Sequence, residues 1–225
     1  MTTYTVDIDA HPPLDRQKRR EFDSALSSLG IREALGAPLT EGVSERECNA
    51  RAISELEYGS LWGHPDCLDQ LENAMLLTVD GGWLSHADAV LTLAETRGIP
   101  VVLQHETREQ IHDVARAYPS LSLIVGGITS RTAMPEPIRQ LMQEHPKLYL
   151  NLSGFIWSCN YVLHEWVQKL PVDRLLFGTA YPQGNPAGKL AGLRWELRDT
   201  DSSVIEKIFR ETAHGLIQGR YHGNH

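Results

Sequence analysis

Short apolar runs alternate with amphipathic segments over the C-terminal two thirds of the chain. Each run of mostly leucine and β-branched residues predicts a buried strand, and apolar positions three and four residues apart predict the helix that follows it. Strands apolar on both faces and separated by helices are typical of parallel βα units. The predicted strands are residues 74–79, 99–104, 121–127, 147–154 and 173–178; the predicted helices are residues 85–98, 107–118, 135–145, 161–170 and 203–217.

Several polar residues and one glycine are placed to begin or end these helices. Ser85 precedes one helical pattern and Gly98 follows it. Thr107 with Gln110, and Ser203 with Glu206, have the spacing of capping boxes. Asp66 is most simply the N-cap of a short helix. These signals predict where the helices begin more closely than the apolar pattern alone.

The N-terminal third is less regular. The segment YTVDIDAH predicts a first strand, and residues 14–30 predict a helix that Gly30 ends. Residues 31–63 hold at most two weak strands, around residues 33–39 and 58–62. Right-handed βα crossovers fit a closed barrel or an open doubly wound sheet, but no glycine-rich phosphate loop follows a strand. We expect one α/β domain over residues 1–225.

The short stretch from residue 31 to residue 63 bears on assembly. It is too short for two βα units with full helices, so we expect a thin or irregular wall there. Parallel strands left uncovered would expose apolar surface. We therefore expect a partner subunit over this wall, and so a homo-oligomer.

Composition restricts the class of partner and the compartment. The formal net charge is -8 and the isoelectric point about 5.7, which argues against nucleic acid and anionic membranes as partners. No apolar run approaches the length of a membrane span. The three cysteines, Cys48, Cys67 and Cys159, are far apart and form no disulfide or zinc framework. A cytoplasmic protein that acts on a small molecule is the simplest expectation.

The ends of the predicted strands carry the candidate catalytic residues. Asp9 and His11 alternate with Asp7 along the first strand and so share a face, which predicts a carboxylate–imidazole pair. His11 could be a general base, a lone metal ligand or a hydrogen-bond donor to substrate, or it could only bond to neighbouring backbone. Asp80 follows a buried strand directly, where it could act in catalysis or form an Asx turn before the glycines.

Other strand-end residues are candidates for substrate binding. Gln104 could point inward and bind a carbonyl or carboxylate, whereas His105 and Glu106 could also belong to a solvated loop. Asn151 and Ser153 point the same way along one strand. The predicted substrate-binding residues are Gln104, His105, Asn151, Ser153, Trp157, Thr179 and Tyr181.

Five of these strand-end segments, taken together, resemble a known family. DIDAHPPL, GIPVVLQHE, YPSLSLIVGGI, LYLNLSG and DRLLFGTAYP resemble, in this order, blocks of the amidohydrolase-2 family of metal-dependent hydrolases and decarboxylases. The similarity extends from about Leu68 to Leu216. It implies a (β/α)8 TIM-like barrel, irregular or incomplete in residues 31–63, whose strand ends in the family hold one or two divalent metals.

The same comparison implies that most metal ligands are missing here. His11 matches the first position of a His-x-His motif, but Pro13 stands at the second. Gln104 stands where the family has a histidine, Gly127 replaces another, and Ala180 replaces the aspartate of the last strand. Zinc sites of this kind need three or four such ligands. We expect no metal or other cofactor, although a divalent ion held weakly through His11 stays open.

Two functions are compatible with this pattern. One is an amidohydrolase-like hydrolase or lyase that acts on a small organic substrate without a standard metal centre, using His11, Asp9 and Asp80 for acid–base chemistry. The other is a non-catalytic relative that binds a small molecule or a partner. The missing ligands favour the second, and the polar groups kept at several strand ends favour the first.

Overall fold

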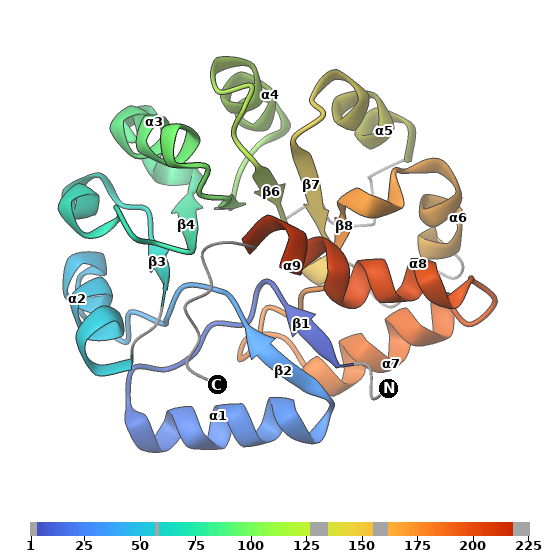
Figure 1. Ribbon diagram of the computed structural model, residues 1–225, viewed down its shortest axis with the longest axis horizontal. Helices are drawn as coiled ribbons and strands as arrows, with labels where there is room; N and C mark the ends of the chain where they lie inside the picture. Colours follow the sequence, from blue (N-terminus) through green and yellow to red (C-terminus); the bar gives the residue numbers. More distant parts are fainter. Residues whose placement is uncertain (1–3, 57–58, 127–134, 155–161, 218–225) are drawn as a thin grey trace.

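Eight parallel strands form the inner layer of the protein in a computed structural model that describes residues 4–56, 59–126, 135–154 and 162–217 (Figure 1). Backbone ladders join β1 to β2 and, in a second sheet, β3 through β8 in sequence order. The strands are β1 (Thr5–Asp7), β2 (Ile31–Ala34), β3 (Ser60–Trp62), β4 (Leu76–Asp80), β5 (Val101–Gln104), β6 (Leu123–Val125), β7 (Leu148–Asn151) and β8 (Leu175–Leu176).

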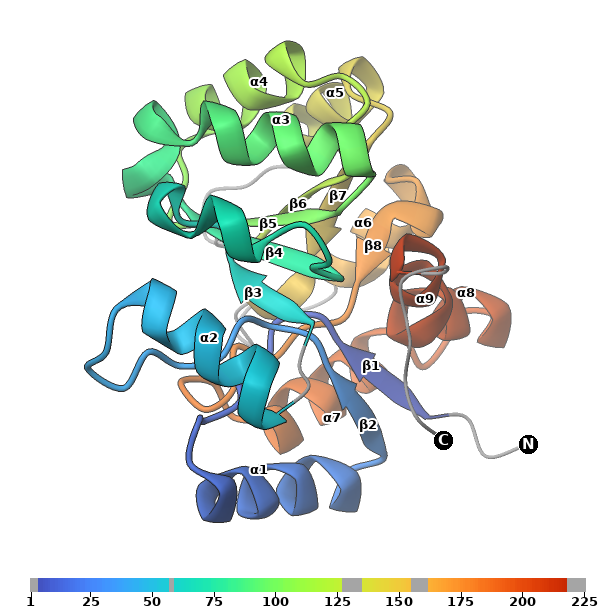
Figure 2. The same cartoon turned by 60° about the vertical axis from the view of Figure 1, so that its left-hand side comes forward.

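The helices lie outside these strands, except that the last one, Thr212–Ile217, lies over one end of the barrel (Figures 1 and 2). They are α1 (Arg16–Ser28), α2 (Glu45–Leu56), α3 (Asp88–Arg97), α4 (Arg108–Ala117), α5 (Pro135–Glu144), α6 (Val162–Lys169), α7 (Pro186–Glu196), α8 (Ser202–Glu206) and α9 (Thr212–Ile217), with a π-helical turn, Lys207–Glu211, between the last two. This arrangement is the expected (β/α)8 barrel.

The two places where the ladder is interrupted are joined by other contacts. Beyond β8, Phe177 O accepts from Ile8 N at 3.1 Å, and Tyr181 O accepts from His11 N at 2.7 Å, so the chain after β8 runs beside the end of β1. Between β2 and β3 a side chain substitutes for a strand partner. Buried Asn49 of α2 accepts from Trp62 N and donates to Trp62 O, both at 2.9 Å.

Apolar side chains form two cores. The larger core lies between strands and helices and includes Phe22, Val90, Ile111 and Trp166. The smaller core lies within the barrel, where alternate strand residues meet α9; it comprises Val6, Ile8, Leu35, Met75, Leu76, Val102, Ile124, Leu176, Ala213 and Ile217. Polar side chains, rather than apolar ones, fill the end of the barrel at which the strands finish.

Some helix boundaries are as predicted. Gly98 ends α3 in the left-handed conformation, with φ of 65°. The capping box of Thr107 and Gln110 is present at the start of α4. Gly30, with φ of 77°, follows α1.

Other boundary predictions are wrong. Ser85 caps no helix, because a 3-10 turn, Gly81–His86, precedes α3 and Ala87 is its N-cap. Asp201, not Ser203, caps α8 by accepting from Ser203 N. His64, not Asp66, caps the turn Pro65–Gln70, since its Nδ1 accepts from Asp66 N.

Residues 31–63 contain two strands and one full helix, the twelve-residue α2, and so do not complete two βα units with full helices, as predicted. The irregular unit is the second one, because β3 is followed only by the 3-10 turn Pro65–Gln70. The homo-oligomer remains a prediction. None of the helices in the described ranges combines the length and apolar character needed to cross a bilayer.

Candidate active site

A cavity of about 430 Å³ opens at the end of the barrel where the strands finish. Parallel pairing sets Asp80 of β4 opposite Gln104 of β5, so both side chains reach the same level. Seven of the predicted site residues line this cavity: Asp9, His11, Asp80, Gln104, His105, Asn151 and Ser153. Strand ends of a parallel barrel converge at one face, which explains why residues far apart in sequence meet here.

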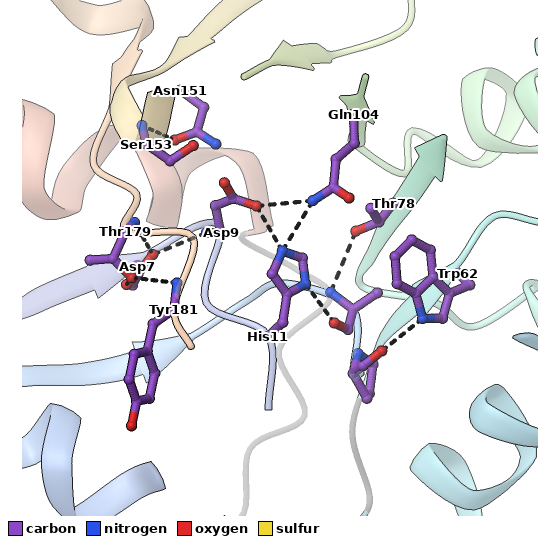
Figure 3. A network of polar contacts seen from close by, with 12 residues as sticks. Asp7, Asp9, His11, Trp62, Thr78, Gln104, Asn151, Ser153, Thr179 and Tyr181 are labelled. Carbon is purple, nitrogen blue, oxygen red and sulfur yellow. Dashed lines mark hydrogen bonds and ion pairs between the residues drawn. The ribbon is translucent and has the colours of Figure 1, made fainter. Parts of the chain in front are cut away.

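Asp9 and His11, the buried pair, lie at the centre of the polar network (Figure 3). Asp9 Oδ1 is 2.9 Å from His11 Nε2, and both side chains are more than nine-tenths buried. His11 Nδ1 is 2.7 Å from Ala37 O, a carbonyl that can only accept, so Nδ1 carries a proton. The contact of Nε2 with a carboxylate oxygen then requires a second proton on the ring. The geometry describes an imidazolium paired with a carboxylate.

The pKa values of the two groups move in the directions that this pair requires. Burial disfavours the Asp9 carboxylate, but the hydrogen bond and charge of His11 outweigh it, and the pKa of Asp9 is lowered. Burial also disfavours a charged imidazole, but the hydrogen bond and charge of Asp9 outweigh it, and the pKa of His11 is raised. Each partner therefore keeps the other ionised.

Gln104 completes a triangle with the buried pair. Its Nε2 is 3.1 Å from Asp9 Oδ1 and 3.0 Å from His11 Nε2 (Figure 3). The opposite amide orientation would set two oxygens without a proton 3.1 Å apart, so the nitrogen belongs at this position. One amide hydrogen can donate to Asp9, and the other can donate to His11 when Nε2 has lost its proton. Gln104 thus has a partner in both protonation states of the histidine.

Asn151 supplies a hydrogen-bond donor at the cavity wall. Its Oδ1 accepts from Ser153 N at 3.0 Å, whereas its Nδ2 is buried and has no partner among the described residues. A Cβ on Gly178 would lie 2.1 Å from Asn151 Oδ1, and one on Gly126 would lie 3.2 Å from Nδ2. The side chain of Asn151 therefore fits only because Gly178 and Gly126 have no Cβ. Its Nδ2 is the hydrogen-bond donor available to a ligand.

Asp80 and His105, the rim pair, line the same cavity in a different setting. Asp80 Oδ2 is 2.7 Å from His105 Nδ1, and Asp80 Oδ1 also accepts from Gly82 N. Asp80 is therefore both the Asx turn and the partner of a histidine. The His105 side chain is 80% exposed, and its backbone has φ of 55°.

Thr179 and Tyr181, predicted to bind substrate, point elsewhere. Thr179 is fully buried, and its Oγ1 donates to Asp7 Oδ2 at 2.6 Å. Tyr181 packs against Phe22 of α1 and points away from His11 (Figure 3). For Tyr181 the reason is the left-handed backbone of Ala180, with φ of 55°, which breaks the strand alternation. Trp157 and Gly127 lie outside the described residues.

The cavity also contains residues that the sequence did not reveal. Trp62, Trp83 and Glu45 line it. Each tryptophan lies at or shortly after the end of a strand, a position that could have identified it. Glu45 begins α2, which was not predicted. Near the cavity, Lys189 Nζ donates to Ser153 O at 2.5 Å. The pKa of this lysine is lowered, because burial outweighs the opposite effect of the Asp9 charge.

The described cavity residues do not fit a standard catalytic metal centre. Asp9 Oδ1 and His11 Nε2 converge, but the third side chain at that point is Gln104, which presents amide hydrogens. Catalytic zinc sites use three protein ligands. Among the described residues, the one group of three possible ligands whose atoms lie within 4.8 Å of one another is His112, Glu144 and His145, and none of these lines the cavity.

Comparisons with known proteins agree with the fold and give a family. The family model described as Amidohydrolase matches residues 60–217, more than half of the chain. No curated protein matches.

Several solved structures are similar over nearly the whole chain. An uncharacterised TIM-barrel protein from Bordetella bronchiseptica is 17% identical, with a TM-score of 0.69 over 96% of this chain and 99% of that one. A 2,6-dihydroxybenzoate decarboxylase in complex with 2,6-dihydroxybenzoate is 13% identical, with a TM-score of 0.66 over 96% and 99%. Dihydroorotase from Campylobacter jejuni is 13% identical, with a TM-score of 0.58 over 98% and 85%. At these identities the similarity establishes the barrel.

Proposed function

The chain belongs to the amidohydrolase family, and we propose that it is a hydrolase or lyase that acts on a small organic substrate without a catalytic metal. The buried pair carries this proposal, because a charged histidine and carboxylate line a cavity whose described residues offer no metal centre. A decarboxylase and a dihydroorotase among the similar structures support a lyase or hydrolase kind of reaction. A cavity of about 430 Å³ suits a small organic molecule.

His11 is the proposed proton donor. Its pKa is raised, which favours a proton on Nε2, and Ala37 O holds Nδ1 of the same ring, which lines the cavity. In a hydrolysis the proton passes from Nε2 to the leaving atom as its bond to the carbonyl carbon breaks, and the neutral imidazole can then accept from Gln104. The hydroxyl group of a water molecule joins the carbonyl carbon, and the remaining proton of that water returns to Nε2. Asp9 keeps its charge throughout and orients the imidazole. Proton transfer by a placed side chain contributes about 10²–10⁴-fold to a rate.

Asn151 is the proposed donor to the substrate oxygen that gains negative charge. Its buried Nδ2 makes no hydrogen bond of ordinary length among the described residues, although the Asn151 side chain helps to lower the pKa of Asp9, and a ligand oxygen would satisfy it. A fixed donor of this kind stabilises charge as it develops in the transition state. Asp80 and His105 are assigned to the edge of the substrate site, because His105 is largely exposed.

A non-catalytic binding protein is the second candidate function. Ala180 favours it, because this residue lines the cavity where the family resemblance has an acid, and a methyl group can move no proton. The two candidates differ in one respect: the first requires turnover that depends on His11, and the second requires binding alone.

Turnover by matched histidine variants tests the proposal. Chelator-treated protein is assayed on a panel of small lactones, aryl esters, cyclic amides and hydroxylated aromatic acids, as wild type, His11→Asn and His105→Asn. The expected result is turnover that survives the chelator, falls about a hundredfold or more in His11→Asn and changes less than about threefold in His105→Asn. Equal losses in both variants, or activity restored only by added metal, would contradict the proposal.

A further inference from the structure

The cavity wall around Trp62, Trp83 and Glu45 has a chemical character of its own. The described residues that line the cavity include three carboxylates, Asp9, Glu45 and Asp80, and no lysine or arginine. Asp9 is paired with His11 and Asp80 with His105. Within the described part of the chain, Glu45 has no hydrogen-bond or ion-pair partner, so its charge is available to a ligand.

Glu45 lies at the N-terminus of a helix and at the edge of the cavity. It is the first residue of α2, where the backbone N–H groups of the helix favour a negative charge. Its side chain is half-buried at the cavity, so the surrounding water screens its charge only in part. A ligand group that enters beside Glu45 therefore meets a carboxylate without a counter-charge among the described lining residues.

The two tryptophans provide an aromatic corner next to this charge. Their ring centroids are 5.8 Å apart with an angle of 73° between the planes, so they form two walls rather than a stack. Trp62 is fixed because its Nε1 donates to Pro38 O at 2.7 Å. Trp83 is fixed because His64 packs against it edge-on, with centroids 4.7 Å apart. One face of Trp62 lies parallel to the His11 ring, with centroids 6.4 Å apart. Both tryptophan rings are half-buried and line the cavity, which leaves the remaining ring surface for a ligand.

Aromatic faces beside a carboxylate recognise positively charged nitrogen. The electron-rich face of tryptophan attracts a cation, and a nearby carboxylate adds to that attraction. An anionic ligand beside these rings would face Glu45 without a lysine or arginine among the described lining residues, since the charges of Asp9 and His11 offset each other. The similar decarboxylase was crystallised with 2,6-dihydroxybenzoate, which is an anion. The wall beside Glu45 favours a cation instead.

We propose that the ligand of this cavity carries an ammonium or quaternary ammonium group, which binds between Trp62 and Trp83 with Glu45 as its counter-charge. The inference rests on the proposed function for one part only, namely that the reacting group of the same ligand faces His11 and Asn151. It narrows the substrate class to small, amine-bearing esters, amides or lactones.

Quenching of tryptophan fluorescence measures this binding without turnover. The probes are benzyltrimethylammonium, neutral benzyl alcohol and anionic benzoate, titrated at constant ionic strength. The variants are Glu45→Gln and its control Glu47→Gln, an exposed glutamate in the same turn of α2. Trp83→Leu, titrated by calorimetry, removes one wall of the corner.

The expected result is that the cation binds at least about tenfold more tightly than either other probe. Glu45→Gln should weaken the cation about fivefold to tenfold and leave benzyl alcohol unchanged, whereas Glu47→Gln should change neither. Trp83→Leu should also weaken the cation. Preference for benzoate, or equal affinities in wild type and Glu45→Gln, would overturn the inference.

The outcome is separable from that of the proposed function. Cation binding that persists in His11→Asn, in a protein without turnover, would support the charge preference and overturn the catalytic proposal. Turnover of anionic substrates with no cation binding would support catalysis and overturn the charge preference.

Discussion

The buried pair and the rim pair are made of the same residue types and line the same cavity. Their closest atoms are 2.9 Å apart in the buried pair and 2.7 Å apart in the rim pair. The side chains of His11 and Asp9 are 8% and 9% exposed, whereas those of His105 and Asp80 are 80% and 29% exposed. The two contacts are therefore nearly equal in length, but one is buried in the protein and the other is exposed to water.

Burial decides how strongly each pair couples to the rest of the protein. An exposed ion pair is worth about 0–1 kcal/mol, because water and salt screen it. Breaking a buried pair by removing one partner costs about 3–5 kcal/mol, since it leaves a charge without compensation. The buried pair, Asp9 and His11, is therefore the one whose charges are strongly coupled. The rim pair, Asp80 and His105, contributes only to the edge of the cavity.

The largest expected effect is on stability when each carboxylate is made neutral. Asp9→Asn should lower the free energy of unfolding by about 3 kcal/mol near pH 6, where His11 is charged and loses its partner. Asp80→Asn makes the same chemical change at the rim and should cost less than about 1 kcal/mol. Urea unfolding followed by circular dichroism measures both. Similar losses for the two variants would show that burial does not distinguish the pairs.

A third aspartate, Asp7, should make the free energy of unfolding depend on pH. It is fully buried, and burial raises its pKa from 3.8 to about 7 despite the hydrogen bond from Thr179. The folded state therefore binds a proton that the unfolded state has released between these two values. The contribution of Asp7 should lower stability as pH rises from about 4 to about 7, by on the order of a few kcal/mol, and should then level off.

His11 contributes to the same trend, and variants separate the two groups. Its pKa is raised, so its contribution is complete below the unfolded value of 6.5 and is lost as pH rises through the folded value. Asp7→Asn should flatten the unfolding free energy between pH 4 and pH 7, and Asp80→Asn should leave the slope as in wild type. A slope that persists in Asp7→Asn would refute this account.

Two glycines next to the pairs give a smaller effect. A Cβ on Gly178 would lie 2.1 Å from Asn151 Oδ1 and 3.1 Å from Asp9 Cβ, so Gly178→Ala should displace Asn151 and cost about 1–3 kcal/mol. A Cβ on Gly82 would meet only Asp80 Oδ1, at 3.0 Å, in an exposed turn where the side chain can move. Gly82→Ala should change stability by less than about 0.5 kcal/mol in thermal unfolding.

The sequence predicted the buried pair because period-two alternation on one strand is a local property. The parallel barrel accounts for Asp80, Gln104, Asn151 and Ser153 lining one cavity, since its strand ends converge. The sequence did not predict Glu45, because the buried side of α2 includes the polar Asn49, which serves as a partner for β3 and interrupts the apolar stripe.

Backbone conformation explains why the side chains of Tyr181 and His105 do not follow the alternation of their strands. The left-handed turn at Ala180 sends Tyr181 toward α1, and nothing in a Thr-Ala-Tyr segment announces a positive φ. His105 shows the same effect in the other direction. It follows the last residue of β5, where continued alternation would turn it to the opposite face from Gln104, yet its φ of 55° returns it to the cavity rim.

The smallest expected effect tests that backbone strain at the rim. A left-handed conformation costs a non-glycine residue about 1 kcal/mol, and the exposed pair with Asp80 returns little. His105→Gly should therefore be more stable than His105→Ala by about 0.5–1 kcal/mol, because both lose the pair and only glycine relieves the strain. At the buried pair the order should reverse: His11 has no positive φ, so His11→Gly should be less stable than His11→Ala. Thermal unfolding of the four variants measures both differences, and the same order at both positions would show that backbone strain does not place His105.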